Sequence, residues 1–239
     1  MNPVALVTGA SRGLGATLAG FLARNGYDLV VTARGRDRLE RTASDLRSFG
    51  GEVQTAAGDV ADPGHRRDVA RRLEAVGRLD LLVNNASGLG VTPLPPLARY
   101  PIEELARLFS VNALAPLALV QETLPLLRRS AGLVVNVTSD AAIGGYPGWG
   151  GYGATKAALD LMSQTLAAEL QDEGVHVVAV DPGDLRTSML QAAFPGEDIS
   201  DRPLPEATLP FWAWLLGQEP AAVSGGRFLA QGTTWEVEG

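Results

Sequence analysis

A tyrosine and a lysine lie four residues apart in this chain, at Tyr152 and Lys156. If the segment is helical, the two side chains share one face and can meet the same ligand. A free tyrosine hydroxyl titrates near ~10, which is too high for easy proton exchange at neutral pH, and a neighbouring ammonium favours the phenolate. The pair therefore predicts an acid or base whose pKa the lysine lowers, although the same spacing is also found in ordinary surface pairs.

A serine that could assist this tyrosine follows the β-prone segment 133–137, at Ser139. Because parallel sheets place ligands at the carboxyl ends of their strands, the Ser139 hydroxyl could orient a carbonyl group toward Tyr152. The two histidines, His65 and His176, lie far from these positions in the sequence and are interpreted as surface or packing residues. No metal site is expected.

A glycine-rich turn joins the first apolar segment, 4–8, to a helical pattern. Its glycines, Gly9, Gly13 and Gly15, would let the backbone approach a pyrophosphate held at the positive end of the helix. Their spacing differs from the common G-x-G-x-x-G pattern. The alternative is a tight turn without a ligand.

An arginine, Arg34, follows the second β-prone segment, 29–32. In dinucleotide folds an acidic residue here accepts hydrogen bonds from the ribose hydroxyls, whereas a basic residue pairs with a 2′-phosphate. Arg12 projects from the glycine turn toward the same corner, and two guanidinium groups suit a phosphate. These residues favour NADP; the alternative is that Arg34 and Arg36 are solvated residues at a helix start.

The composition excludes several classes of protein. The 239 residues carry a formal net charge of −7, which argues against a nucleic-acid partner or an anionic membrane surface. The sequence has no cysteine, so disulfides, thiolate metal clusters and cysteine nucleophiles are excluded, and a cytoplasmic protein is expected. Neither a leader nor an apolar run of roughly 20 residues is recognised, so no membrane partner is expected.

Apolar β-prone segments alternate with helical patterns along most of the chain. The expected strands are 4–8, 29–32, 53–59, 79–83, 133–137 and 175–180, and the expected helices are 14–22, 39–46, 63–76, 102–129 and 153–173. Parallel neighbours need right-handed crossovers, so this order predicts an α/β doubly wound Rossmann fold, about seven parallel strands with helices on both faces. Pro116 and Pro125 should kink or divide the helix 102–129.

Five motifs resemble, in order and spacing, the short-chain dehydrogenase/reductase family: the turn 8–15, Asn84-Asn85-Ala86, Ser139, Tyr152 with Lys156, and Pro182-Gly183. The resemblance covers nearly the whole chain. It implies that Tyr152 is the general acid or base, and that Lys156 lowers its pKa and binds the nicotinamide ribose. Ser139 would position the substrate.

The resemblance also implies roles for residues that are otherwise ordinary. Asn112 would hold a water-linked proton relay to the lysine, the alternative being a helix-kink residue near Pro116. Asp59 and Val60 would lie beside the adenine, Asn84 to Ala86 would border the ribose, and Pro182, Gly183 and Thr187 would contact the nicotinamide amide. The full set of expected cofactor-binding residues is Gly9, Ser11, Arg12, Gly13, Leu14, Gly15, Arg34, Asp59, Val60, Asn85, Ala86, Tyr152, Lys156, Pro182, Gly183 and Thr187.

The chain departs from the family pattern at two places. Ser87 stands where the family usually has glycine, after the Asn-Asn-Ala segment, and the proline-interrupted region 188–205 replaces the variable substrate loop. This region leaves the substrate open. Ile143, Tyr146, Trp149 and Leu190 could form an apolar wall of the substrate pocket.

Taken together, residues 1–239 predict one catalytic domain, with 188–205 as a short substrate loop. The expected protein is an NADP(H)-dependent oxidoreductase that transfers a hydride between nicotinamide and a carbonyl or alcohol substrate. Two alternatives stay open: a catalytically silent NADP-binding sensor or partner-binding protein of the same fold, and an isomerase or dehydratase with no net change of the nicotinamide. The family resemblance implies a homodimer or homotetramer.

Overall fold

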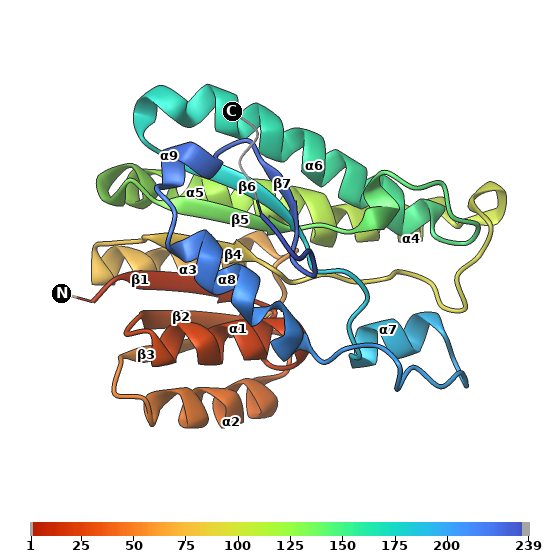
Figure 1. Cartoon of the computed structure of the whole chain (residues 1–239), viewed down its shortest axis with the longest axis horizontal. Helices are drawn as coiled ribbons and strands as arrows, with labels where there is room; N and C mark the ends of the chain where they lie inside the picture. Colours follow the sequence, from red (N-terminus) through yellow and green to blue (C-terminus); the bar gives the residue numbers. More distant parts are fainter. Residues whose placement is uncertain (1, 236–239) are drawn as a thin grey trace.

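The computed structural model describes residues 2–235; Met1 and residues 236–239, the two ends of the expected domain, lie outside the described residues. In the described part, one parallel sheet has the strand order β3-β2-β1-β4-β5-β6-β7 (Figure 1). The strands are β1 (Val4–Thr8), β2 (Asp28–Ala33), β3 (Val53–Ala57), β4 (Leu81–Asn84), β5 (Leu133–Val137), β6 (His176–Asp181) and β7 (Arg227–Leu229). The predicted doubly wound parallel sheet is confirmed.

Helices cover both faces of this sheet. They are α1 (Gly13–Arg24), α2 (Arg36–Arg47), α3 (Pro63–Val76), α4 (Ile102–Phe109), α5 (Ala115–Ser130), α6 (Gly150–Leu170), α7 (Ser188–Ala193), α8 (Leu209–Leu216) and α9 (Pro220–Val223). Apolar residues of α1, α2 and α8 form one core layer, and those of α3, α5 and α6 form the other. Strands β1, β5 and β6 are buried along their whole length between these layers, which explains why apolar residues predominate in them.

Local sequence signals set the ends of several elements. The Asp62 side chain accepts a hydrogen bond from the Gly64 amide, 2.8 Å away, and caps α3, with Pro63 at the first turn. Gly77 ends the same helix in the left-handed conformation, at φ +84°. The start of α3 at Asp62 and Pro63 agrees with the sequence-based prediction.

The expected helix 102–129 is divided, although not by its prolines. A π-helical turn, Ser110–Leu114, separates α4 from α5. Pro116 lies in the first turn of α5, where its missing amide hydrogen is tolerated, and Pro125 lies within α5. The extra residue of the π turn therefore makes the break, and Asn112 stands in it.

The helix expected at 153–173 begins three residues earlier, at Gly150. Gly151 and Gly153 resemble helix breakers in the sequence, but they serve close packing. A Cβ atom on Gly151 would lie 2.4 Å from the Tyr100 ring, and one on Gly153 would lie 2.3 Å from the Ala141 carbonyl oxygen. The glycines therefore let the start of α6 approach its neighbours.

The strand order positions the functional residues. β1 lies between β2 and β4, so the connections that follow β1 and β4 lead to opposite sides of the sheet. This divergence opens a crevice at the carboxyl ends of these strands. The loop that carries α7 lies at that end of the molecule, far from the N-terminus (Figure 1). Among the described residues no helix combines the length and apolar character needed to cross a membrane.

Candidate active site

A cleft of about 930 Å³ opens at the carboxyl ends of the central strands. Every residue expected to bind the cofactor lines it, and so does Ser139. Asn112 lies behind the wall and is fully buried. The fold therefore gathers segments from residue 9 to residue 187 around one cavity.

The glycine turn is shaped by close backbone contacts. Gly9 and Gly13 have positive φ angles, +69° and +53°. A Cβ atom on Gly15 would lie 2.4 Å from Nδ2 of Asn85 and 2.5 Å from the Gly9 carbonyl oxygen. Asn85 Nδ2 donates a hydrogen bond to the Thr8 carbonyl at 2.8 Å, so the loop after β4 fastens the turn after β1.

The N-terminus of α1 faces the cleft without a protein cap. Arg12 occupies the N-cap position, where it provides no side-chain acceptor, and no acidic residue lies in the first turn. The first amides of the helix are thus left for an external acceptor. An anionic group at this end would also be favoured by the helix dipole.

Three arginines line one corner of the cleft, and we call Arg12, Arg34 and Arg38 the basic corner. All three are exposed, and within residues 2–235 none of them forms an ion pair. Arg38 was not predicted; its position in the first turn of α2, four residues after Arg34, is the sequence signal that could have identified it. Arg36 does not line the cleft.

Asp59 and Val60 also line the cleft. The Asp59 carboxylate accepts a hydrogen bond from the Ala61 amide at 2.9 Å, and the Val60 carbonyl accepts one from Arg66 at 2.7 Å. Both residues therefore have structural partners of their own. At the opposite end, Gly183 has φ +69°, and Gln231 Nε2 donates to the carbonyl oxygens of Pro182 and Asp184, which holds that loop in place.

Tyr152 and Lys156 lie in the first turns of α6, and both are buried at the cleft. The Lys156 ammonium donates to the Val137 carbonyl at 2.7 Å and lies 5.6 Å from the centre of the Tyr152 ring. Burial lowers the pKa of Lys156 to about 8, against the opposing effect of Asp160 and Asp181.

Burial also raises the pKa of Tyr152 well above its ordinary value. Hydrogen bonding with the Ser87 and Ser139 side chains opposes this, while the charges of Asp181 and Asp140 add to the rise. The expected lowering of this pKa by Lys156 is not found in the structure, because desolvation of the phenolate outweighs every stabilising contact. The phenol is therefore protonated at neutral pH.

Ser139 stands directly after β5, as expected. Its hydroxyl donates to the Asp140 carboxylate at 3.0 Å and accepts from the Ala141 amide at 3.2 Å. Its carbonyl oxygen accepts a hydrogen bond from Arg227, 2.9 Å away on β7. Sequence reasoning missed Arg227, because nothing in its local pattern links it to a serine 88 residues earlier.

Asn112 connects the loop after β4 to α6. Its Oδ1 accepts from the Gly88 amide at 2.9 Å and from the Ser87 hydroxyl at 3.1 Å, and its Nδ2 donates to the Gly88 carbonyl at 2.9 Å and to Thr155 Oγ1 at 3.0 Å. The π turn directs this side chain inward. A relay role for Asn112 stays a prediction.

The expected apolar wall is formed in part. Tyr146, Trp149 and Leu190 line the cleft, but Ile143 does not and is 75% exposed, so its assignment was wrong. Ile143 lies at the end of a short 3-10 turn, Asp140–Ala142, which directs it to the surface. The Trp149 ring meets Tyr152 edge-on at 5.7 Å and lies 6.1 Å from Phe194, which sequence reasoning missed.

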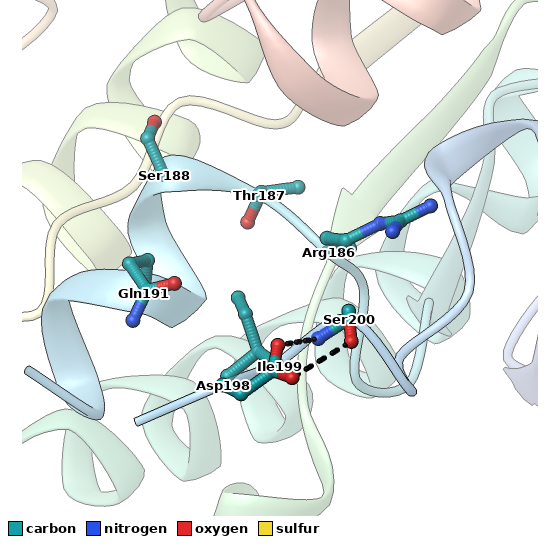
Figure 2. Close-up of a pocket in the computed structure, with 7 residues that line it drawn as sticks. All are labelled: Arg186, Thr187, Ser188, Gln191, Asp198, Ile199 and Ser200. Atoms are coloured by element: carbon teal, nitrogen blue, oxygen red, sulfur yellow. Dashed lines mark hydrogen bonds between the residues drawn. The ribbon is translucent and has the colours of Figure 1, made fainter. Parts of the chain in front are cut away.

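The region 188–205 is more ordered than a plain loop. Thr187 caps α7 by accepting from the Leu190 amide at 3.2 Å, and Arg186 donates through its amide to the Pro203 carbonyl at 2.8 Å. Figure 2 shows a second cavity, of about 380 Å³, beside this helix. At its edge lies a turn in which the Asp198 carboxylate accepts hydrogen bonds from the Ser200 amide and hydroxyl (Figure 2). Both carboxylate oxygens therefore already have hydrogen-bond donors within the turn.

The histidines have packing environments. His65 Nε2 hydrogen-bonds with Thr32 Oγ1 at 2.7 Å, and His176 begins β6. Across residues 2–235, no group of three or more histidine and carboxylate side chains is arranged to hold a metal ion.

Comparison with known proteins agrees with this architecture. The family model for short chain dehydrogenases matches residues 3–198. The chain belongs to the short chain dehydrogenase family. Members of this family are oxidoreductases, and the match extends from the glycine turn through α6 to the loop that carries α7.

Individual relatives support the family over most of their length. A 3-oxoacyl-[acyl-carrier-protein] reductase, FabG, of Staphylococcus epidermidis is 33% identical over 212 residues, which cover 87% of this chain and 85% of the relative. A solved short chain dehydrogenase from Pseudomonas syringae has a TM-score of 0.90 at 34% identity and covers 96% and 94% of the two chains. Another from Escherichia coli, solved in complex with NADPH, has a TM-score of 0.89 at 32% identity, with 96% and 97% covered.

Proposed function

We propose that this short chain dehydrogenase is an NADP(H)-dependent enzyme that interconverts a small carbonyl compound and its alcohol, with Tyr152 as the general acid or base. The observation that carries the proposal is the convergence of the Tyr152, Ser139 and Lys156 side chains on one cleft that also contains the glycine turn. The similar short chain dehydrogenase from Escherichia coli was solved in complex with NADPH, which supports the same cofactor here.

The cleft fits a dinucleotide with a 2′-phosphate. The uncapped start of α1 and the positive φ angles of Gly9 and Gly13 provide a place for a pyrophosphate. The basic corner offers guanidinium groups to a further phosphate on the adenosine side. Lys156, Pro182, Gly183 and Thr187 would hold the nicotinamide end, whose reduced ring supplies a hydride when bound.

The side chains around Tyr152 can then support the transfer of one proton between Tyr152 and the substrate oxygen. In the direction of reduction, the protonated phenol donates to the carbonyl oxygen of the substrate, which Ser139 holds by a hydrogen bond. The raised pKa of Tyr152 keeps the donating form populated at neutral pH. Lys156 stabilises the resulting phenolate by its positive charge, and Asn112 is proposed to support the return of the proton through water.

The rest of the assignment follows the same lines. We infer that the whole chain acts as one catalytic domain and that residues 188–205 form the substrate loop. The apolar residues Trp149, Leu190 and Phe194 favour an uncharged reacting group near Tyr152. Because a relative is named a 3-oxoacyl reductase, 3-oxoacyl thioesters are a first group to assay beside simple ketones.

Tyr152→Phe tests the proposal. Removal of the hydroxyl should lower carbonyl reduction by about 100- to 10,000-fold, while NADPH binding, followed by fluorescence, stays within a few-fold of the unmodified enzyme. Oxidation of NADPH at an unchanged rate in this variant would overturn the assignment of the acid.

The same assays separate the alternatives. A silent sensor or partner-binding protein would bind NADPH and show no turnover with any carbonyl or alcohol in the panel. An isomerase or dehydratase would convert its substrate without a net change in nicotinamide absorbance. Running NADP and NAD side by side measures the cofactor preference.

A further inference from the structure

Arg227, on β7, contacts three segments that border the candidate active site. Its Nε donates a hydrogen bond to the Asp160 carboxylate on α6 at 3.0 Å. Its Nη2 donates to the Ser139 carbonyl at 2.9 Å and to the Asp181 carboxylate, at the end of β6, at 3.3 Å. Arg227 does not line the cleft, so any effect that it has on the reaction passes through these partners.

Asp181 extends the contact of Arg227 to the loop at the proposed nicotinamide end of the cleft. Its Oδ2 atom accepts from Arg227, and its Oδ1 atom accepts from the Gly183 amide at 2.9 Å. The Asp181 side chain is buried, and its backbone carbonyl accepts from the Ala230 amide, just after β7, at 2.8 Å. The guanidinium therefore fixes the orientation of a carboxylate that holds the start of this loop.

The end of β5 is held by two cationic side chains. The Lys156 ammonium donates to the Val137 carbonyl at 2.7 Å. Two residues later, the Arg227 guanidinium donates to the Ser139 carbonyl. Asp160, one helical turn after Lys156 on α6, forms an ion pair with Arg227. The backbone that carries the Ser139 hydroxyl is therefore fixed between α6 and β7.

We propose that Arg227 is a positioning residue, which keeps the Ser139 and Gly183 segments at a fixed separation across the cleft. This inference rests on the proposed function, in which Ser139 holds the substrate and Gly183 helps to hold the nicotinamide. Hydride transfer requires reacting atoms about 3–3.5 Å apart, and a displacement of about 1 Å can slow a reaction about a hundredfold. The arginine itself takes no part in the transfer of the proton or the hydride.

Arg227 also neutralises buried carboxylates, so its removal changes stability as well as position. The two effects can be separated with Asp160→Asn. In Arg227→Gln the Asp160 carboxylate stays buried without its cation, and adding Asp160→Asn removes that charge and should raise the temperature of unfolding. The double variant still lacks the contacts with Ser139 and Asp181. Asp160→Asn alone is the reference, because it retains Arg227 and shares any effect of the lost carboxylate on Lys156.

The first readout is the kinetics of carbonyl reduction. Relative to Asp160→Asn, the double variant should have a kcat lower by about ten- to a hundredfold, with a much smaller change in the KM of the substrate, because the loss is one of alignment. Arg78→Gln is the control, since Arg78 pairs with Asp80, which precedes β4 at the opposite end of the sheet. It should leave kcat unchanged.

The second readout is binding, and it needs no turnover. NADPH contacts both ends of the proposed site, whereas 2′,5′-ADP carries only the adenosine half and should bind at the basic corner. The affinity of the double variant for NADPH should be weaker than that of Asp160→Asn by about two- to tenfold, the effect of one net hydrogen bond. Its affinity for 2′,5′-ADP should be unchanged. Calorimetric titration measures both.

Each outcome decides the inference. Equal kcat and equal NADPH affinity in the double variant and Asp160→Asn would overturn it while leaving the proposed function intact. A parallel loss of affinity for NADPH and 2′,5′-ADP would also overturn it, because it would indicate a general distortion of the cleft. Absence of turnover in an unmodified protein that binds NADPH would instead remove the proposed function, and the two affinities would still test the positioning role.

A third variant covers a failure of the glutamine variants to fold, as judged by thermal unfolding. Arg227→Lys keeps the positive charge but presents one nitrogen in place of the guanidinium fork, so it cannot hold all three acceptors at once. It should show the same selective loss of NADPH affinity, to a smaller extent. An unmodified kcat and unmodified affinities in Arg227→Lys would then overturn the inference.

Discussion

Lys156 is the only lysine in the chain. The other 19 of the 20 lysine and arginine residues are arginines. This makes its ionisation directly measurable. In the cofactor-free protein, lysine labelled at Cε should give one side-chain signal that titrates with a midpoint of about 8, because burial disfavours the ammonium. A midpoint near that of an exposed lysine would contradict the buried environment.

The lowered pKa of Lys156 also predicts a pH-dependent stability. Between pH 8 and 10.5 the unfolded chain binds a proton that the folded chain has released, so stability should rise with pH in that window. Below it, the folded protein carries the full penalty of a buried ammonium. We therefore compare the free energy of unfolding of Lys156→Met with that of the unmodified protein. The difference should favour the variant by on the order of 2 kcal/mol more at about pH 7 than at about pH 9.5, as measured by chemical unfolding.

Arg34 should decide the choice between the two dinucleotides. Arg34→Ser removes a charge-assisted partner of a 2′-phosphate and should weaken NADPH binding by about ten- to a hundredfold, with little effect on NADH. Fluorescence titration with both cofactors measures this. Arg36→Ala, next to the basic corner but outside the cleft, should change neither affinity. An equal loss for NADPH and NADH would argue against a phosphate site.

At the scale of elements, β7 ties three segments of the site together through Arg227. Its guanidinium bonds to Asp160 of α6 at 3.0 Å, to Asp181 at the end of β6 at 3.3 Å, and to the Ser139 carbonyl after β5 at 2.9 Å. The carboxylates are almost fully buried, so the arginine neutralises charge that water cannot reach. Burial raises the pKa of Asp181 even with this partner present.

Arg227→Gln should therefore be costly for the fold. Loss of the guanidinium charge leaves the buried carboxylates of Asp160 and Asp181 without a cationic partner. The free energy of unfolding, measured in urea, should therefore fall by about 2–4 kcal/mol. Arg71→Gln is the comparison, because the Arg71–Asp68 pair is exposed and should contribute less than about 1 kcal/mol. A double-mutant cycle of Arg227→Gln with Asp160→Asn should show a coupling energy between the two residues. Additive effects of the two substitutions would mean that Arg227 and Asp160 do not stabilise the fold as a pair.

At the scale of the whole molecule, the π turn before α5 and the helix α6 present apolar residues to the surface. Leu114, before α5, is 50% exposed, and Leu161, on α6, is 65% exposed. Exposed leucines on neighbouring helical segments are compatible with the homodimer or homotetramer expected from the family resemblance. The chain mass is 25.0 kDa.

Light scattering after gel filtration should accordingly give two or four times the mass of one chain. Leu161→Glu should shift the distribution toward smaller species, because a charge would be buried at the contact. Glu169→Gln, a change at an exposed position of the same helix, serves as the control. A single-chain mass at every protein concentration would contradict the expectation.

The sequence by itself determined the order of strands and helices from β1 to β6 and the loops that carry the candidate site, but not α8, α9 or β7. These features depend on local patterns: unbroken apolar segments for buried parallel strands, helical periodicity, and glycine, serine or asparagine at strand ends. The glycine turn and Ser139 lie where those patterns predict them. The same local reading was wrong for Ile143, since its exposure depends on a turn that composition does not specify.

Only the tertiary structure decided which side chains gather around Tyr152 and how deeply its ring is buried. Ser87, Asn112 and Ser139 come from separate segments, and Arg227 reaches Ser139 across 88 residues of sequence. Such contacts follow from sheet order and helix packing, which no short window of sequence contains. Desolvation likewise depends on complete burial, so the raised pKa of Tyr152 could not be read from a lysine four residues away.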